Sequence, residues 1–282
     1  MTTPVTTRVT LLGTAGGPMP KGSRAAPANA VTVGGETYVI DCGSGTGRQL
    51  VRAGIAPESV RAILVTHHHS DHNVDMGTLP LLFWGRLTRP VQVIGPPPLR
   101  RAMDGFLQMA RYDIDIRVAD EGRPLLDDLL DVREFDAAGG VYEDARVRIT
   151  AARVTHPPIE HAFAYRVDTP DRSVVFSGDT TPCDAVVDLA RGADTLVHEV
   201  FHEPALAAHL QGYQGSSIMK HMLASHTRVE DVGAIAQRAG VRRLVLNHFV
   251  PTTDDIDYAE WGRLAGIGFD GEVVVGEDLM EV

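Results

Sequence analysis

A run of metal-binding side chains directly follows a short apolar segment, and this feature constrains the fold more than any other. Residues Thr66–His72 read Thr-His-His-His-Ser-Asp-His, and the residues before them have the β-branched, apolar character of a buried strand. In a turn that ends a strand, His67 and His69 can point the same way, while Asp71 and His72 can face a second point nearby. Imidazole and carboxylate are ligands for zinc, and manganese or iron can replace it. The sequence therefore predicts a metal site here.

Similar apolar segments recur along the chain and predict sheets packed together with helices on their outer faces. The predicted strands are Val9–Leu12, Tyr38–Asp41, Ala62–Thr66, Val91–Ile94, Val147–Thr150, Ala162–Val167, Ser173–Ser177, Thr195–His198, Leu244–Leu246 and Glu272–Val275. The predicted helices are Gly47–Ala53, Pro98–Ala110, Asp184–Arg191 and Val229–Ala239. Gly240 is expected to end the last of these helices, and Thr227 or Arg228 stands where its N-terminal cap is expected.

Composition limits the classes of protein to consider. The 282 residues are 44% hydrophobic, enough for a sizeable core, and no linker or repeat divides them. Lys and Arg number 26 against 37 Asp and Glu, so the formal charge of −11 disfavours non-specific nucleic-acid binding. Two cysteines, Cys42 and Cys183, exclude a disulfide framework. No apolar run is long enough to cross a membrane, and the polar first residues lack the pattern of a signal peptide, so we expect a cytoplasmic protein without a membrane partner.

The pattern His-x-His-x-Asp-His after a strand resembles the signature of the metallo-β-lactamase superfamily. That family also has an Asp at the end of an early strand, a third His at a later strand end, an Asp after another strand and a last His after a late strand. Asp41, His156, Asp179 and His248 stand at these positions in the same order. The resemblance extends from Arg8 to about Pro251 and implies a four-layer αββα sandwich, which we expect to be one domain over residues 1–282.

The resemblance implies two neighbouring zinc ions, with Mn²⁺ or Fe as alternatives. The first ion would be held by His67, His69 and His156, and the second by Asp71, His72 and His248, with Asp179 bridging the two. Two such ions can hold a hydroxide between them, which suits attack on phosphoryl, sulfuryl or acyl centres. We expect Asp41 to accept a hydrogen bond from a ligand imidazole or to steady the glycine turn after it, rather than to bind metal.

A Glu and a further His narrow the resemblance to one branch. Glu199 ends the strand that starts at Thr195, and His226 stands shortly before the predicted helix Val229–Ala239. This pair resembles the ribonuclease Z branch, which includes arylsulfatase-like and phosphodiesterase members. There the His donates a proton to the leaving oxygen and the Glu orients it, so we expect Asp71, His226 and Glu199 to be the catalytic residues. The alternative is that His226 caps its helix and Glu199 forms a structural salt bridge.

The resemblance departs from tRNA-processing members at one place. These members carry a long Gly/Pro- and Lys-rich arm between the third His and the bridging Asp. Here 179 − 156 leaves 23 positions, which two predicted strands and a turn at Pro170–Asp171 fill. We therefore expect a zinc-dependent hydrolase of a small ester, a phosphodiester or an aryl sulfate, with a small-molecule rather than a nucleic-acid partner. Lactone or β-lactam hydrolysis and hydrolytic dehalogenation are alternatives, while tRNA 3′ processing and di-iron redox chemistry are less favoured.

Two stretches, near residues 81–136 and 201–222, are expected to be insertions that border the metals. In the first, the side chains that can receive an aryl or acyl group, or form ordinary core or a dimer contact, are Phe83, Trp84, Phe106, Met109 and Tyr112. In the second, Gly212–Ser217 is expected to be a loop, and His209 and His221 are expected at the surface.

The roles of His161 and His198 stay open. The turn Gly13–Gly17 is expected to serve tight geometry and to offer backbone N–H groups to a substrate oxygen. A homodimer is possible.

Overall fold

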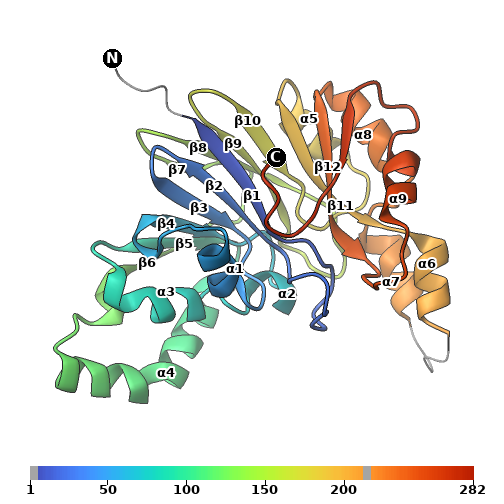
Figure 1. The fold of residues 1–282 in the computed structure, drawn as a ribbon. Coiled ribbons are helices and arrows are strands. Elements are labelled where there is room, and N and C mark those ends of the chain that lie inside the picture. The colour runs from blue at the N-terminus through green and yellow to red at the C-terminus, as the bar shows by residue number, and fades with distance from the viewer. Residues whose placement is uncertain (1–5, 212–216) are drawn as a thin grey trace.

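Two β-sheets face each other in the computed structural model, which describes residues 6–211 and 217–282 (Figure 1). The first sheet has the order β1-β2-β3-β4-β5-β6. Its strands are β1 Thr7–Gly13, β2 Ala28–Val33, β3 Glu36–Ile40, β4 Val60–Leu64, β5 Val91–Gly95 and β6 Leu130–Glu134. The first three strands are antiparallel, and β3 to β6 are parallel. Parallel strands need both faces covered, which predicts helices outside this sheet.

The second sheet has the order β13-β12-β11-β10-β9-β8-β7. Its strands are β7 Gly139–Glu143, β8 Arg148–Arg153, β9 Phe163–Asp168, β10 Ser173–Phe176, β11 Thr195–Phe201, β12 Arg243–Val250 and β13 Glu272–Val275. Strands β7 to β10 are antiparallel, and β10 to β13 are parallel. The parallel half thus has the same requirement for covering helices.

Helices flank both sheets and complete the four layers. The helices are α1 Thr46–Arg52, α2 Ser70–Asn73, α3 Thr78–Phe83, α4 Leu99–Glu121, α5 Asp184–Ala190, α6 Glu203–His209, α7 Ile218–Ser225, α8 Val232–Ala239 and α9 Tyr258–Ala265. Figure 1 shows α1, α3 and α4 on the outer side of the first sheet and α5, α8 and α9 beyond the second. The expected αββα sandwich is confirmed.

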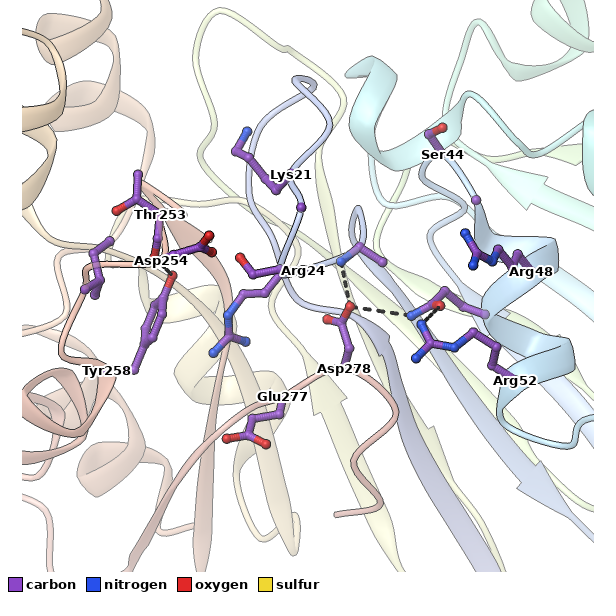
Figure 2. Close-up of a pocket in the computed structure, with 16 residues that line it drawn as sticks. Lys21, Arg24, Ser44, Arg48, Arg52, Thr253, Asp254, Tyr258, Glu277 and Asp278 are labelled. Carbon is purple, nitrogen blue, oxygen red and sulfur yellow. Dashed lines mark hydrogen bonds between the residues drawn. The ribbon is translucent and has the colours of Figure 1, made fainter.

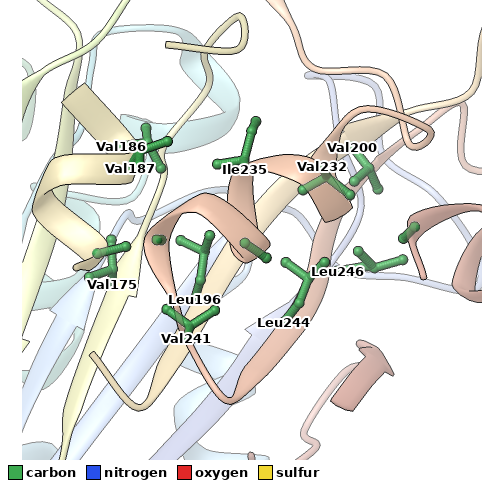
Figure 3. Packing of buried hydrophobic residues seen from close by; sticks show 14 of the residues in the cluster. Val175, Val186, Val187, Leu196, Val200, Val232, Ile235, Val241, Leu244 and Leu246 are labelled. Atoms are coloured by element: carbon green, nitrogen blue, oxygen red, sulfur yellow. The ribbon is translucent and has the colours of Figure 1, made fainter. Parts of the chain in front are cut away.

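Three apolar layers hold the sheets and helices together. Between the sheets, Tyr38 and Leu64 pack in one buried cluster with Phe163 and Val197 from the opposite sheet. Outside the second sheet, apolar residues of α5 and α8 face strands β10 to β12, as Figure 3 shows. Outside the first sheet, residues of α1, α3 and α4 form the third buried cluster. The alternation of inward- and outward-facing residues along the strands gives each sheet two apolar faces, which requires these layers.

The structure corrects three expectations about secondary structure. Strands β2, β6 and β7 were absent from the prediction. Of these, β6 and β7 are edge strands and have charged or glycine residues in place of an apolar run. Helix α4 reaches Glu121 instead of ending at Ala110. Helix α8 starts at Val232, after Asp231, because Val229 still donates a backbone hydrogen bond to Phe201 of β11 and therefore continues the sheet.

The stretch 81–136 contributes strands β5 and β6 and the covering helix α4. Phe83 and Trp84 are buried in apolar clusters, while Met109 and Tyr112 are exposed, so these side chains do not gather as an aryl pocket. The predicted loop Gly212–Ser217 falls almost wholly on residues 212–216, which lie outside the described residues. Among the helices that the structure describes, none is long and apolar enough to cross a membrane.

Candidate metal centre

Loops at one edge of the two sheets bring together the side chains predicted as ligands. The segment after β4, which includes α2, carries His67–His72, while His156 and Asp179 follow β8 and β10 and His248 lies within β12. Parallel strands end at the same edge of a sheet, and loops at that edge are where such folds place their chemistry. The structure groups His67, His69, His156 and Asp179 in one set, and Asp71, His72 and His248 in a second, each with its ligand atoms within 4.8 Å of one another.

Asp179 lies between the two sets. Its Oδ2 is 3.8 Å from Nε2 of His67 in the first set. The same oxygen is 3.4 Å from Nε2 of His72 and 3.3 Å from Nε2 of His248 in the second set. Its other oxygen, Oδ1, is buried without a hydrogen-bond partner among the described residues. A buried carboxylate oxygen without a partner is costly unless a cation faces it, so this position suits a bridging ligand.

Hydrogen bonds on the far side of the rings fix which nitrogen faces the centre. Asp41 accepts the Nδ1 proton of His72 at 2.8 Å and the hydroxyl proton of Thr66 at 3.0 Å. Thr66 Oγ1 has donated its proton, so it accepts from Nδ1 of His67 at 3.0 Å. The backbone oxygen of Ser225 accepts from Nδ1 of His156 at 2.8 Å. Each of these three histidines therefore presents the lone pair of Nε2 to the centre.

Lone pairs and carboxylates that converge in this way fit a cation. Nδ1 of His69 is 3.1 Å from Nε2 of both His67 and His156. In the second set, Nε2 of His72 is 3.2 Å from Nε2 of His248. Such groups of acceptors repel each other unless positive charge lies among them, and nitrogen and oxygen donors are suitable for divalent zinc. These nitrogen and oxygen donors therefore fit a divalent metal ion.

Burial and neighbouring charges shift the pKa values of these groups in different directions. Burial lowers the pKa of His67 well below its usual value and that of His69 to about 4. Burial acts the same way on His72, but the carboxylates of Asp179, Asp41 and Asp71 together raise its pKa well above the usual range. Burial opposes charge on Asp179 too, yet His248 and His72 hold its pKa well below normal. Burial thus favours neutral imidazoles in the first set, and Asp179 stays charged, whereas the raised pKa of His72 means that this residue releases a proton when a metal binds.

A His–Glu pair borders the metal-ligand sets. Nδ1 of His226 lies 3.0 Å from Oε1 of Glu199 and 3.9 Å from Oδ2 of Asp179. Burial alone lowers the pKa of His226, but the charge and hydrogen bond of Glu199, with Asp179, raise it to about 9. His226 follows α7 and lies ahead of the Asp231 cap of α8, so it does not cap that helix. A protonated imidazole held in this way can donate a proton at neutral pH.

His221 also lies at this centre, which the sequence analysis did not expect. It is on α7, partly exposed, with its ring centroid 5.5 Å from that of His226, 5.9 Å from His156 and 6.2 Å from His69. Burial lowers its pKa, and the charges of His226 and His156 lower it further. The only sequence signal for this position was its nearness to His226, because α7 is placed by tertiary contacts rather than by a strand end.

The other histidines singled out from the sequence lie apart from the two sets. Nε2 of His68 lies 2.8 Å from the backbone oxygen of Pro96. His161 contacts Arg153 on β8 at 3.4 Å. His198 is fully buried with Nδ1 2.7 Å from the backbone oxygen of Glu199. None of these three belongs to a metal-ligand group among the described residues.

The glycine turn before Pro18 acts on the ligands rather than on a substrate. The N–H of Gly17 donates to Oδ2 of Asp71 at 3.0 Å, so that amide is already used. A Cβ on Gly16 would lie 2.8 Å from Nδ1 of His248 and 2.4 Å from Val250. The expected role in tight geometry therefore agrees with the structure, while the amide of Gly17 serves a predicted ligand instead of a substrate oxygen.

A pocket of about 700 Å³ is lined by the loop between β1 and β2, by α1 and by residues before and at the start of α9. Figure 2 shows Lys21 and Arg24 on the loop between β1 and β2, Arg48 and Arg52 on α1, and Tyr258 on the opposite wall. A smaller pocket shares Lys21, Arg24 and Ser44 with it and includes Gly17, which bonds to Asp71. Burial lowers the pKa of Lys21, while the charge of Asp71 raises it, which places this cation near the ligands. The two pockets therefore share the loop between β1 and β2, which also contacts Asp71.

Comparison with known proteins gives a matching family model and curated relatives. The model of the "Beta-lactamase superfamily domain" matches residues 36–249. A protein named ribonuclease Z from Mycobacterium bovis (strain BCG / Pasteur 1173P2) is 33% identical over 278 residues, which are 97% of each chain. One of the same name from Mycolicibacterium paratuberculosis is 35% identical over 278 residues, again 97% of each.

Solved structures share the fold. Human tRNase Z, short form, superposes with a TM-score of 0.72 at 22% identity, covering 98% of each chain. The metallo-β-lactamase fold protein YhfI from Bacillus subtilis has a TM-score of 0.72 at 20% identity, covering 98% of this chain and 99% of that one. A diphosphatase from the PhnP family has a TM-score of 0.66 at 16% identity, covering 98% and 97%. At these identities the likeness is one of fold.

Proposed function

Because this chain belongs to the beta-lactamase superfamily, in the branch that includes ribonuclease Z, and is therefore a hydrolase of the metallo-β-lactamase fold, we propose that it is a zinc-dependent phosphodiesterase. The observation that carries this proposal is the buried pair His226–Glu199 at 3.0 Å, with a pKa of about 9 for the histidine. An acid of this kind has a use only when the leaving oxygen is too basic to depart unaided.

The proposed ligands divide as the geometry groups them. His67, His69 and His156 would hold one ion and Asp71, His72 and His248 the other, with Asp179 between them. When bound, two such ions supply Lewis acidity to phosphoryl oxygens and lower the pKa of a coordinated water. Asp41, Thr66 and the backbone of Ser225 keep the ligand nitrogens pointed inward.

His226 would supply the proton for the leaving group. Nδ1 of His226 donates a hydrogen bond to Glu199, so the proton on Nε2 is the one that His226 can give to the leaving oxygen. As the bond between phosphorus and the ester oxygen breaks, that oxygen receives the proton of Nε2 and departs as an alcohol, and His226 becomes neutral. Glu199 and Asp179 stabilise the charged imidazole beforehand. This requirement favours alkyl phosphodiesters over aryl halides and aryl sulfates, whose leaving groups depart as stable anions and need less help from an acid.

Ribonuclease activity is the second candidate, because relatives 33–35% identical carry the name ribonuclease Z. Their name indicates an RNA substrate, which contrasts with the small-molecule partner expected from the sequence. Two observations weigh against a tRNA substrate gripped by an arm. Between His156 and Asp179, the structure describes the hairpin β9–β10, and the net charge is −11. The observation in favour of a polyanionic substrate is the presence of Lys21, Arg48 and Arg52 in the large pocket, which Asp254, Glu277 and Asp278 also line.

Steady-state hydrolysis of bis(p-nitrophenyl) phosphate tests the proposal. Protein stripped with a chelator and dialysed is compared with the same protein reloaded with zinc or manganese, and the bound metal is counted by elemental analysis. We expect turnover only after reloading, with two ions per chain. In parallel, p-nitrophenyl sulfate and a precursor tRNA with a 3′ trailer are offered as substrates.

Turnover of the phosphodiester with little hydrolysis of the sulfate supports the proposal. Efficient cleavage of the precursor tRNA favours the second candidate instead. If the metal-loaded protein hydrolyses neither bis(p-nitrophenyl) phosphate nor the precursor tRNA, both proposed functions are contradicted.

A further inference from the structure

Helix α7 places one more imidazole at the opening of the centre, and neither the proposed ligand sets nor the acid uses it. His221 contributes a ring nitrogen that lies within 4.8 Å of ring nitrogens of His156 and His226. Its helix is anchored by Met222, which is buried against Phe201 and Leu206. His221 itself stays partly exposed on the same helix. The helix thus holds this ring at the boundary between the centre and solvent.

Hydrogen bonds fix which nitrogen of His221 is free. The hydroxyl of Ser225 donates its proton to the backbone oxygen of Pro157, which can only accept. The same Oγ lies 3.2 Å from Nδ1 of His221, and having donated its proton, it must accept there. Nδ1 of His221 therefore carries the proton, and Nε2 presents a lone pair. A partner for that lone pair has to be a hydrogen-bond donor.

If His226 protonates the leaving oxygen, the leaving group is the part of the substrate closest to His221, because the two rings are neighbours. In the proposed reaction the leaving oxygen lies within hydrogen-bond distance of Nε2 of His226, about 3 Å. The ring of His221 is adjacent, at 5.5 Å between centroids, and is more exposed than that of His226. A substituent on the carbon next to the leaving oxygen would therefore lie between the two rings. A hydroxyl at that position is a donor that matches the lone pair.

We propose that His221 binds the leaving group of the substrate by accepting a hydrogen bond from a hydroxyl next to the leaving oxygen. This inference rests on the proposed function, because it takes His226 as the acid. The substrate class that it names is a phosphodiester whose departing alcohol is a vicinal diol, such as a ribonucleoside that leaves through its 3′ oxygen. His221 then acts as a residue that sets specificity for ribose over deoxyribose in the leaving group.

The test compares two dinucleotides that differ by one hydroxyl. The ribodinucleotide UpU and its analogue that lacks the 2′-hydroxyl on the upstream nucleoside are hydrolysed by the zinc-loaded protein, and the products are separated by chromatography. We expect uridine and 5′-UMP from UpU, with kcat/KM about 10-fold higher than for the deoxy analogue, the size of one hydrogen bond. The variant His221→Phe keeps a ring but has no acceptor, and we expect its ratio of the two rates to fall to about 1.

Further variants separate binding from structure. His221→Gln keeps an acceptor oxygen, and we expect it to restore part of the preference for the ribose substrate. His161→Phe is the matched control, because His161 contacts Arg153 away from the centre, and we expect it to keep the full ratio. The metal content of His221→Phe is measured as well, and we expect two ions per chain.

Three results would overturn the inference. One is a ribose preference that survives in His221→Phe, and another is a loss of metal from that variant, which would make His221 a ligand. The third is a wild-type protein that hydrolyses bis(p-nitrophenyl) phosphate but shows no ribose preference, in which case the proposed function stands and only the inference fails. Absence of hydrolysis of every phosphodiester removes the proposed function, and the inference falls with it.

Discussion

Glu199 acts through a single oxygen atom. Its Oε1 accepts hydrogen bonds from Nδ1 of His226 at 3.0 Å, the N–H of Thr180 at 2.9 Å and the N–H of Thr227 at 3.3 Å. Two of these donors are backbone amides, so the carboxylate is held in place by the chain itself and cannot turn away from the imidazole. The position of the His226 ring and its raised pKa therefore have the same cause.

The charge of Glu199 can be removed with little change in shape. In Glu199→Gln the group that most raises the pKa of His226 is lost, so burial should dominate and the imidazole should lose its proton at a lower pH. Because the acid works only when protonated, the wild-type rate on an alkyl phosphodiester should fall above about pH 9. In the variant we expect this fall to occur at lower pH, measured as kcat/KM against pH. An unchanged profile would contradict the role of Glu199.

Asp41 holds the ring of His72, a proposed ligand, without belonging to either set of possible metal ligands. It accepts from Nδ1 of His72 and from Thr66, and its backbone has a φ of 62°, which Asn tolerates well. Asp41→Asn should therefore keep the loop but weaken the metal site, by about 10- to 100-fold in affinity. Competition with a chromophoric chelator measures this, with Asp131→Asn, at a partly exposed position on β6, as control. Equal affinities in the two variants would show that Asp41 does not support the ligands.

At the level of elements, loops together with α2 and β12 carry the proposed ligands, and close packing holds these segments in place. The loop between β1 and β2 touches two proposed ligands, through the bond from Gly17 to Asp71 and through the contact of Gly16 with the ring of His248. Gly16 leaves no room for a side chain there, because the nearest atoms belong to Val250 and His248. The loop therefore defines the position of the second ligand set.

A single methyl group on this loop tests that packing. In Gly16→Ala the new Cβ would lie 2.4 to 2.9 Å from Val250 and the His248 ring, so the imidazole has to move. We expect the variant to fold but to bind one metal ion instead of two, as measured by elemental analysis after dialysis. Gly22→Ala, on the same loop with nothing within 4 Å of the added Cβ, is the control and should bind two. If both variants bind two ions, the loop does not define the position of the second ligand set.

How far the sequence predicts each element depends on what places it. The proposed ligands follow predicted strands, and strand ends gather at one edge, so their positions could be inferred from spacing. His221 could not be inferred, because α7 is positioned by the burial of Met222 against β11 and α6. The start of α8 was predicted three residues too early, since the pairing of Val229 with Phe201 overrides its helical pattern. Tertiary contacts decided both cases.

At the level of the whole molecule, polar contacts supplement the apolar layer between the sheets. Asp144, in the turn between β7 and β8, accepts hydrogen bonds from Tyr38 of the opposite sheet at 2.6 Å and from Tyr142 at 2.8 Å. It also accepts from the N–H groups of Arg146 and Val147. Burial opposes the charge, but these bonds together hold the pKa of Asp144 below its usual value. The carboxylate thus connects the two sheets at a point away from the metal-ligand sets.

The sign of this pKa shift predicts how the contribution depends on pH. A carboxyl whose pKa is lower in the folded protein stabilises it above its unfolded pKa, about 3.9, and loses that effect as pH falls through the folded pKa. Asp144→Asn should therefore lower the free energy of unfolding by about 1–2 kcal/mol at pH 7, and less at about pH 3. Urea unfolding of metal-free protein measures both values. A difference that does not depend on pH would contradict the assignment to the charged carboxylate.

The central claim, that His226 protonates the leaving oxygen of a phosphodiester, is tested most directly by varying the leaving group. Zinc-loaded wild-type protein and His226→Ala are compared on a series of phosphodiesters whose leaving groups range from p-nitrophenol to a simple alkyl alcohol. The account predicts that the variant loses about 100-fold or more of the rate on the alkyl esters. The loss on the p-nitrophenyl ester should be much smaller, because p-nitrophenolate departs without a proton. An equal loss across the whole series would contradict it, because His226 would then act on binding or structure rather than on the departing oxygen.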